Sequence, residues 1–79
     1  MHIGGVIVGA GMEMRLHPGD YLWGSHTVTF MVSQVVGQCH EWGSTWLVLD
    51  GSEKPTPTTP WRERRLLVRI EALKRSMTP

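Results

Sequence analysis

Cys39, His40 and Glu41 stand side by side and combine a thiol, an imidazole and a carboxylate, the groups that bind zinc or carry nucleophilic catalysis. Zinc sites usually space their ligands as Cys-x-x-Cys or His-x3–5-His pairs, and consecutive side chains point apart in most backbone conformations. A catalytic thiol also needs a base within hydrogen-bond reach and a cleft. A run of neighbours meets neither requirement, so we expect no metal site, no catalytic residue and no enzymatic activity.

A second chemical motif is the glycine pair in the apolar run Val6–Gly11, VIVGAG. Such a run, ending in Gly-x-Gly, is typical of the start of a dinucleotide-binding βαβ unit. The third glycine of that fingerprint, which packs the helix on the strand, is replaced by Met14. Pro18-Gly19 then signals a turn before a crossover helix could form. We therefore expect no dinucleotide and no other cofactor.

The tryptophans and the single tyrosine are the next candidates for function. Tyr21 and Trp23 alternate, which predicts that they share a face. Trp42 or Trp46 beside them would complete a groove for an extended or proline-rich peptide. The competing interpretation places aromatic side chains in the core, and we favour it for Trp23 and Trp46. Tyr21, Trp23 and Trp42 are thus the candidate peptide groove.

The basic residues are concentrated at one end of the chain. Residues 1–60 contain two basic and five acidic side chains, whereas residues 61–79 contain six basic and two acidic ones. Arg62, Arg65 and Arg69 form a candidate nucleic-acid face, because small barrels bind nucleic acid through basic surfaces with aromatic neighbours. The alternative is a solvated strand face with Arg–Glu pairs across strands.

The overall composition limits the class of protein. A chain of 79 residues forms one domain and buries only about 60–65% of its unfolded surface, so its stability is marginal without help from a partner. One cysteine excludes an internal disulfide and favours a reducing, cytoplasmic setting. No apolar run approaches the length of a membrane span, and we expect neither a signal peptide nor a membrane partner.

The elements that would position these residues are mostly strands. Residues 26–33 alternate between apolar and polar side chains, and the alternation slips at Val35-Val36, which predicts a bulge. Residues 37–43 are expected to form a connecting loop. Residues 44–49 are expected to form a strand that ends at an Asp50-Gly51 turn, and residues 52–60, which contain three prolines, an exposed loop.

The C-terminal segment, residues 62–76, fits two patterns. Alternation predicts a strand through about Glu71 followed by a helical turn, whereas apolar residues spaced i, i+4, i+7 and i+11 fit a helix that starts near Pro60. The β pattern of the rest of the chain favours the strand. We expect a mainly β, partly open barrel of about five strands over residues 12–75, preceded by an extension, residues 1–11, that is either disordered or an added strand.

The stretch from Leu16 to Leu73 also resembles a known group. The pattern Leu-x-Pro-Gly-Asp-Tyr-Leu-x-Gly, a Thr/Val strand, Glu-Trp, Trp-Leu-Val and Arg-Arg-Leu-Leu-Val-Arg-Ile-Glu-Ala-Leu is similar to that of short, uncharacterised actinobacterial proteins. The resemblance covers about three quarters of the chain and implies an SH3-like barrel, without an activity to transfer.

These observations favour a non-enzymatic interaction module. A small core and an open sheet edge predict binding to a protein partner or self-association as a homodimer. The alternative is weak, sequence-tolerant nucleic-acid binding through the C-terminal arginines. No small-molecule substrate is evident from the sequence.

Overall fold

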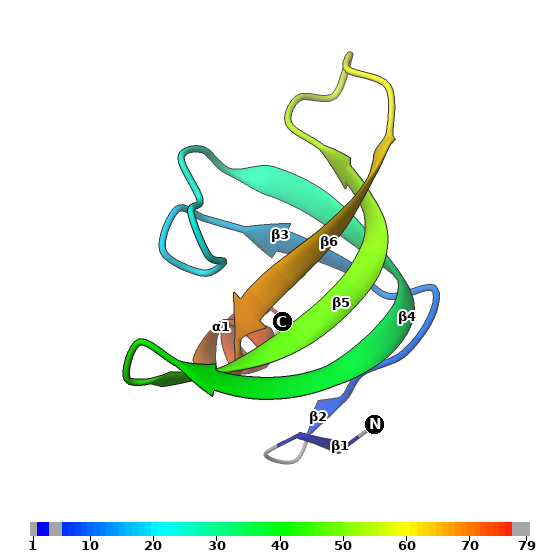
Figure 1. The fold of residues 1–79 in the computed structure, drawn as a ribbon. Helices are drawn as coiled ribbons and strands as arrows, with labels where there is room; N and C mark the ends of the chain where they lie inside the picture. The colour runs from blue at the N-terminus through cyan, green and yellow to red at the C-terminus, as the bar shows by residue number, and fades with distance from the viewer. Residues whose placement is uncertain (1, 4–5, 77–79) are drawn as a thin grey trace.

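The computed structural model describes the backbone of residues 2–3 and 6–76 and the side chains of residues 8–73. Four antiparallel strands in the order β3-β4-β5-β6 form a curled half-barrel (Figure 1). The strands are β3 (Glu13–Leu16), β4 (Val28–Glu41), β5 (Ser44–Lys54) and β6 (Arg62–Arg69), and the helix α1 (Ile70–Ser76) follows. The predicted mainly β class is confirmed, with four strands in this sheet.

A separate two-stranded sheet precedes the half-barrel. It pairs β1 (His2–Ile3) with β2 (Val6–Ile7), while residues 1, 4 and 5 of the predicted extension lie outside the described residues. Val8 is fully buried in the core, and the Gly11 N–H donates to the Val32 carbonyl at 2.8 Å. From Val8 onward the extension is therefore part of the packed domain.

Strand β4 is longer than the sequence predicts. Residues 37–41 continue it, so the expected loop over residues 37–43 is wrong, and only Trp42-Gly43 connects β4 to β5. The pairing of β4 with β5 shifts register between Val32 and Gln34 and again between Val35 and Gly37, which confirms the predicted irregularity at Val35-Val36. Each shift bends the strand and increases its twist, and this curls the sheet.

Strand β5 also runs past its predicted end. Asp50-Gly51 is not a turn, and residues 52–54 belong to β5 and not to the Thr/Pro loop. A Cβ atom on Gly51 would lie 2.1 Å from the carbonyl oxygen of Met31 on β4 and 2.8 Å from Cζ of Phe30. Glycine is required here because the two strand backbones approach closely inside the curl.

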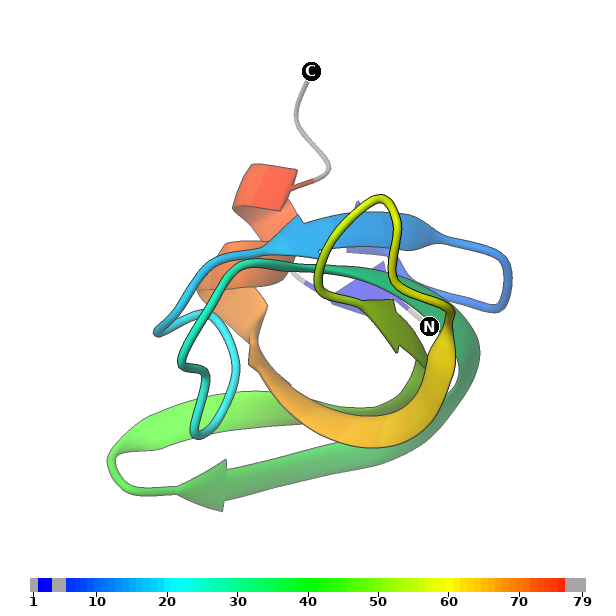
Figure 2. The same cartoon turned by 90° about the horizontal axis from the view of Figure 1, so that it is seen from above.

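The core fills the concave side of the half-barrel. Alternate residues of each strand point inward, and α1 packs beside β3 and the end of β6 (Figure 2). The strand expected through Glu71 ends at Arg69, and the predicted helical turn is confirmed as α1. The buried cluster consists of Val8, Met14, Leu16, Tyr21, Val28, Phe30, Val32, Leu47, Leu49, Leu66, Val68, Ala72 and Leu73.

The segment between β3 and β4 lies along β6. The Leu22 N–H donates to the Leu67 carbonyl at 2.9 Å, and the Arg69 N–H donates to the Asp20 carbonyl at 2.8 Å. Asp20 also fixes the preceding turn, because its carboxylate accepts the His17 N–H at 2.7 Å. These bonds give part of the outer edge of β6 a partner within the chain.

Candidate binding surfaces

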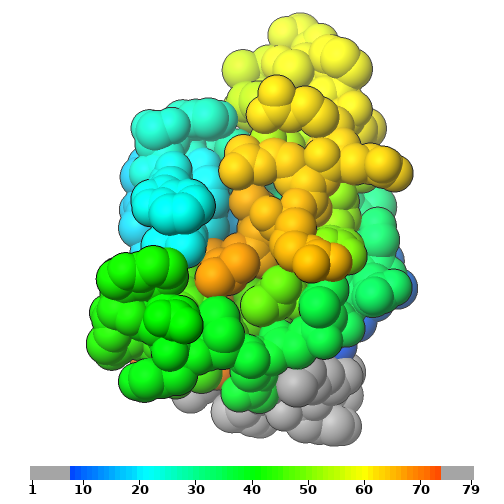
Figure 3. All heavy atoms as spheres, in the orientation of Figure 1, coloured from blue at the N-terminus to red at the C-terminus, as the bar shows by residue number. Residues whose placement is uncertain are grey.

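Trp23 and Trp42 form an exposed aromatic pair. They come from the segment between β3 and β4 and from the β4–β5 turn, and 85% and 68% of their surfaces are exposed. Their ring centroids are 6.4 Å apart and the ring planes are inclined by 59°. Figure 3 shows the cyan segment that contains residue 23 next to the green segment that contains residue 42 on one face of the molecule. The core interpretation of Trp23 is therefore wrong.

Both tryptophans occupy backbone positions that favour glycine or asparagine. The φ angle is 59° at Trp23 and 50° at Trp42. Trp42 and Gly43 (φ 74°) are the two central residues of a hairpin turn with positive φ at both, which usually has the sequence Asn-Gly. Trp23 is the third residue of a turn closed by the Gly24 N–H and the Tyr21 carbonyl at 3.1 Å. A bulky residue in this region costs about 1–3 kcal/mol, so local backbone preference does not select either tryptophan.

Tyr21 does not belong to this surface. Only 3% of it is exposed, and its hydroxyl donates to the His26 carbonyl at 2.6 Å. The predicted shared face of Tyr21 and Trp23 is wrong because the segment turns between them, and alternation holds only in a strand. Trp46 is buried as expected, and its indole N–H donates to the Glu41 carbonyl at 2.9 Å.

The three arginines of the predicted nucleic-acid face, Arg62, Arg65 and Arg69, do not share one side of β6. Arg62 has the same parity as the inward-facing Leu66 and Val68, whereas Arg65 and Arg69 alternate with them on the outer side. Arg65 makes two hydrogen bonds to the Asp50 carboxylate, at 2.7 and 3.1 Å, and Arg69 stacks over the Trp46 ring with its Cζ 5.3 Å from the centroid.

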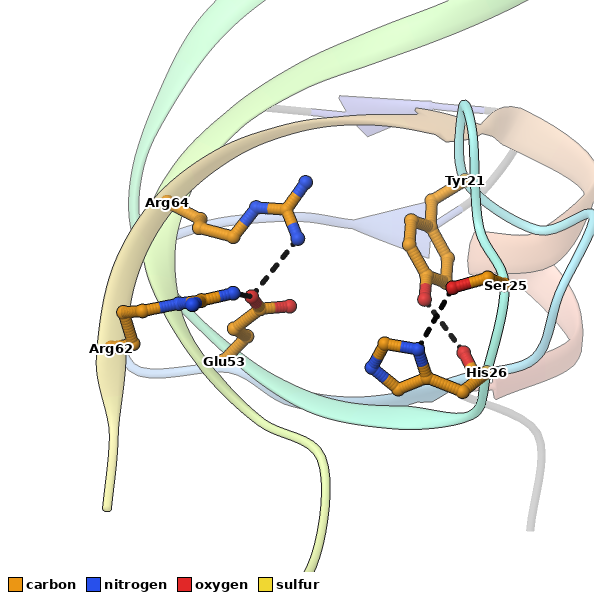
Figure 4. A network of polar contacts seen from close by, with 6 residues as sticks. All are labelled: Tyr21, Ser25, His26, Glu53, Arg62 and Arg64. Atoms are coloured by element: carbon orange, nitrogen blue, oxygen red, sulfur yellow. Dashed lines mark hydrogen bonds and ion pairs between the residues drawn. The ribbon is translucent and has the colours of Figure 1, made fainter. Parts of the chain in front are cut away.

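Arg62 instead joins Arg64 at a buried carboxylate that the sequence did not reveal. Both guanidinium groups donate to Oε1 of Glu53, at 2.7 and 2.9 Å (Figure 4). Only 1% of Glu53 is exposed, and its Oε2 has no hydrogen-bond partner among the described residues. The signal that was missed is the alternation along β5. Every second residue from Leu47 through Leu49 and Gly51 faces inward, and Glu53 is the next position in this series.

Both paired carboxyl groups are held in the charged form. Burial opposes ionisation of Glu53, but the hydrogen bonds from Arg62 and Arg64 outweigh it, so the pKa of Glu53 is below its ordinary value. The hydrogen bonds from Arg65 likewise lower the pKa of Asp50. These ion pairs attach β6 to β5, and they pair three arginines with two carboxylates.

The last three residues of β4 are Cys39, His40 and Glu41. Cys39 is a half-buried free thiol, and the His40 ring nitrogen Nδ1 lies 3.1 Å from the Thr45 hydroxyl. Within the described residues, no three His, Cys, Asp or Glu side chains are grouped so that they could hold a metal ion. In the same part of the chain, no helix has both the length and the apolar character required to cross a membrane.

Comparisons with protein-family models, with curated proteins and with solved structures returned no match to this chain.

Proposed function

We propose that this chain is an SH3-like half-barrel that acts as a non-enzymatic protein-binding module, with the Trp23–Trp42 pair as its contact surface. The observation that supports the proposal is the combination of exposure, proximity and unfavourable backbone in two large aromatic residues. Tryptophan is enriched among the residues that dominate binding energy at protein interfaces. A surface that stabilises the folded chain so poorly is readily explained by the free energy that it supplies to a complex.

The partner that best suits this surface is an extended, proline-containing segment. Indole rings inclined to one another offer two apolar walls, and a pyrrolidine ring stacks well on such walls. A polyproline helix is already extended before binding, so little conformational entropy is lost when it docks. The two N–H groups of the indoles add hydrogen-bond donors for the backbone carbonyls of the peptide.

The test is a tryptophan-fluorescence titration with decaproline, and with an alternating Gly-Ser decapeptide as the control ligand. We expect decaproline alone to shift the emission to shorter wavelength. Trp23→Ala and Trp42→Ala are each expected to weaken binding about ten-fold or more. Val36→Ala, which removes an exposed apolar side chain from β4, is expected to leave the affinity unchanged.

Two results would overturn the proposal. One is the absence of any decaproline-dependent change in a folded, monomeric protein. The other is a dimer in light scattering that Trp42→Ala dissociates, because a second copy of the chain would then be the occupant of this surface.

Nucleic-acid binding through Arg62, Arg65 and Arg69 is the weaker candidate, since the first and second of these are paired with carboxylates.

A further inference from the structure

A pocket of about 310 Å³ lies between the outer face of the curled sheet and the Thr/Pro loop, residues 55–60. Figure 2 shows this loop, in olive and yellow, crossing β3 and the first residues of β4 when the molecule is seen from above. The volume is at the lower end of the range for small-molecule sites. The polar and aromatic groups in its lining are Glu13, Arg15, Thr27, Thr29, Lys54 and Trp61.

Two cations in the pocket are held in a row by the sheet register. Arg15 of β3 is directly opposite Thr29 of β4, and Thr29 is directly opposite Lys54 of β5. Cross-strand neighbours have Cβ atoms about 5 Å apart, so the two cationic residues flank one threonine on the same face. Considering the described residues alone, neither Arg15 nor Lys54 forms a salt bridge. Their positive charge is available to an anion.

Trp61 supplies a flat apolar surface beside these charges. It follows the Thr/Pro loop directly, 43% of its surface is exposed, and the Lys54 ammonium lies 5.2 Å from the ring centroid. The ammonium approaches one face of the indole, while an aromatic ring has a second face on which a planar group can stack. The pocket thus joins an anion-attracting row to a stacking surface.

We propose that this pocket binds a nucleoside phosphate. The phosphate lies between Arg15 and Lys54, and the base stacks on Trp61. The hydroxyl groups of Thr27 and Thr29 and the carboxylate of Glu13 are suitable partners for ribose hydroxyls and base N–H groups. Because Glu13 offsets one of the two positive charges, a single phosphate group fits the pocket better than a triphosphate. Such a unit is available as a free nucleoside monophosphate or within single-stranded RNA.

The experiment is a titration of the isotopically labelled chain, followed by the backbone amide and indole N–H signals in two-dimensional NMR. The ligands are uridine 5′-monophosphate, an eight-residue oligouridylate, uridine, inorganic phosphate and a phosphoserine peptide. We expect both nucleotide ligands to shift the Trp61 indole signal together with the Arg15 and Thr29 amides. Much tighter binding of the oligouridylate identifies RNA as the source of the ligand, and similar affinities identify the free nucleotide.

Single-residue variants test the stacking surface and the cationic row of the pocket separately. Trp61→Ala is expected to weaken binding about ten-fold, and Trp61→Phe to retain most of it. Arg15→Ala is expected to weaken binding, whereas Arg69→Ala removes the same charge from a different surface and is expected to have little effect. If the parent makes two phosphate contacts, its affinity for the oligouridylate should fall about seven-fold between 50 and 200 mM salt. Arg15→Ala retains one of these contacts, so its affinity should fall only about three-fold over the same salt range.

Three outcomes would overturn the proposal. One is the absence of shifts at Trp61 and Arg15 with both nucleotide ligands. Another is binding of inorganic phosphate or the phosphoserine peptide as tightly as the nucleotide, with Trp61→Ala unaffected, because the base would then contribute nothing. The third is an equal loss in Arg69→Ala and Arg15→Ala, which would indicate attraction to net charge alone. Signals remote from the pocket serve as the fold control.

Discussion

Gly51→Ala is the most direct test of how the sheet is curled. The added methyl group would lie 2.1 Å from the Met31 carbonyl oxygen, whereas carbon and oxygen atoms rarely approach within about 3.3 Å. The overlap is therefore about 1.2 Å. Met31 contributes backbone of the paired strand β4, and Phe30, which the methyl group would also meet, is fully buried. Neither obstacle can be removed by a simple side-chain rotation.

The cost follows from that geometry. Overpacking that side chains can absorb costs about 1–3 kcal/mol, and a clash with backbone is expected to reach or exceed the upper value. A domain of this length is stable by about 4–12 kcal/mol in total. Since 1 kcal/mol shifts the midpoint of a small domain by about 4–8 °C, we expect Tm to fall by at least about 12 °C.

Thermal and urea unfolding followed by circular dichroism measure this effect. Gly37→Ala is the matched control, because Gly37 also lies in a long strand of the hairpin but its added methyl group has no neighbour within 4 Å. Its stability should change by no more than about 1 kcal/mol. A Gly51→Ala protein as stable as the parent, or an equal loss in Gly37→Ala, would refute the close approach of β5 to β4.

Three further perturbations test the ion pairs and the strained turn. The pKa of Glu53 is lower in the folded chain than in the unfolded one, so its carboxylate stabilises the fold above pH about 4.5. This contribution is lost as the pH falls through the folded-state pKa. Urea titrations at a series of pH values should therefore show that the parent loses stability in acid more steeply than Glu53→Gln does. Arg64→Ala, which removes one of the two donors to that carboxylate, should lower the unfolding free energy by about 1 kcal/mol, and no loss would show the pair to be dispensable. Trp42→Asn should raise the unfolding free energy by about 1 kcal/mol because it gives the hairpin its preferred turn, and a loss of stability instead would contradict the assignment of strain to Trp42.

The strands themselves could be predicted wherever burial alone decides the pattern. Residues 28–32 alternate because one side of β4 faces the core and the other faces solvent, and that signal is local. Asp50-Gly51 misled the prediction because the same dipeptide suits a tight turn and a close contact between strands. Only the approach of β4, which lies about 20 residues earlier in the chain, decides between these two uses.

The candidate sites were less predictable than the strands, for a related reason. Parity with Leu66 and Val68 places Arg62 and Arg64 on the inner side of β6, but their partner Glu53 was assigned to a loop once β5 had been ended too early. The row of Arg15, Thr29 and Lys54 depends on the register of three strands. Register is set by turn and bulge positions together with the core, and a single strand's sequence does not contain it.

The Trp23–Trp42 pair affects both the stability of the fold and the proposed binding. If Trp42→Asn stabilises the fold, the parent chain forgoes about 1 kcal/mol at a turn where a common substitution would recover it. A second tryptophan with positive φ, in contact with the first but distant from it in sequence, makes an unrelated accident at each turn a poor explanation. Strained residues persist where a site needs a particular side chain at a particular place. We therefore propose that binding, and not folding, explains the sequence of the two turns. Under this proposal the same variant should gain stability while it loses affinity for decaproline.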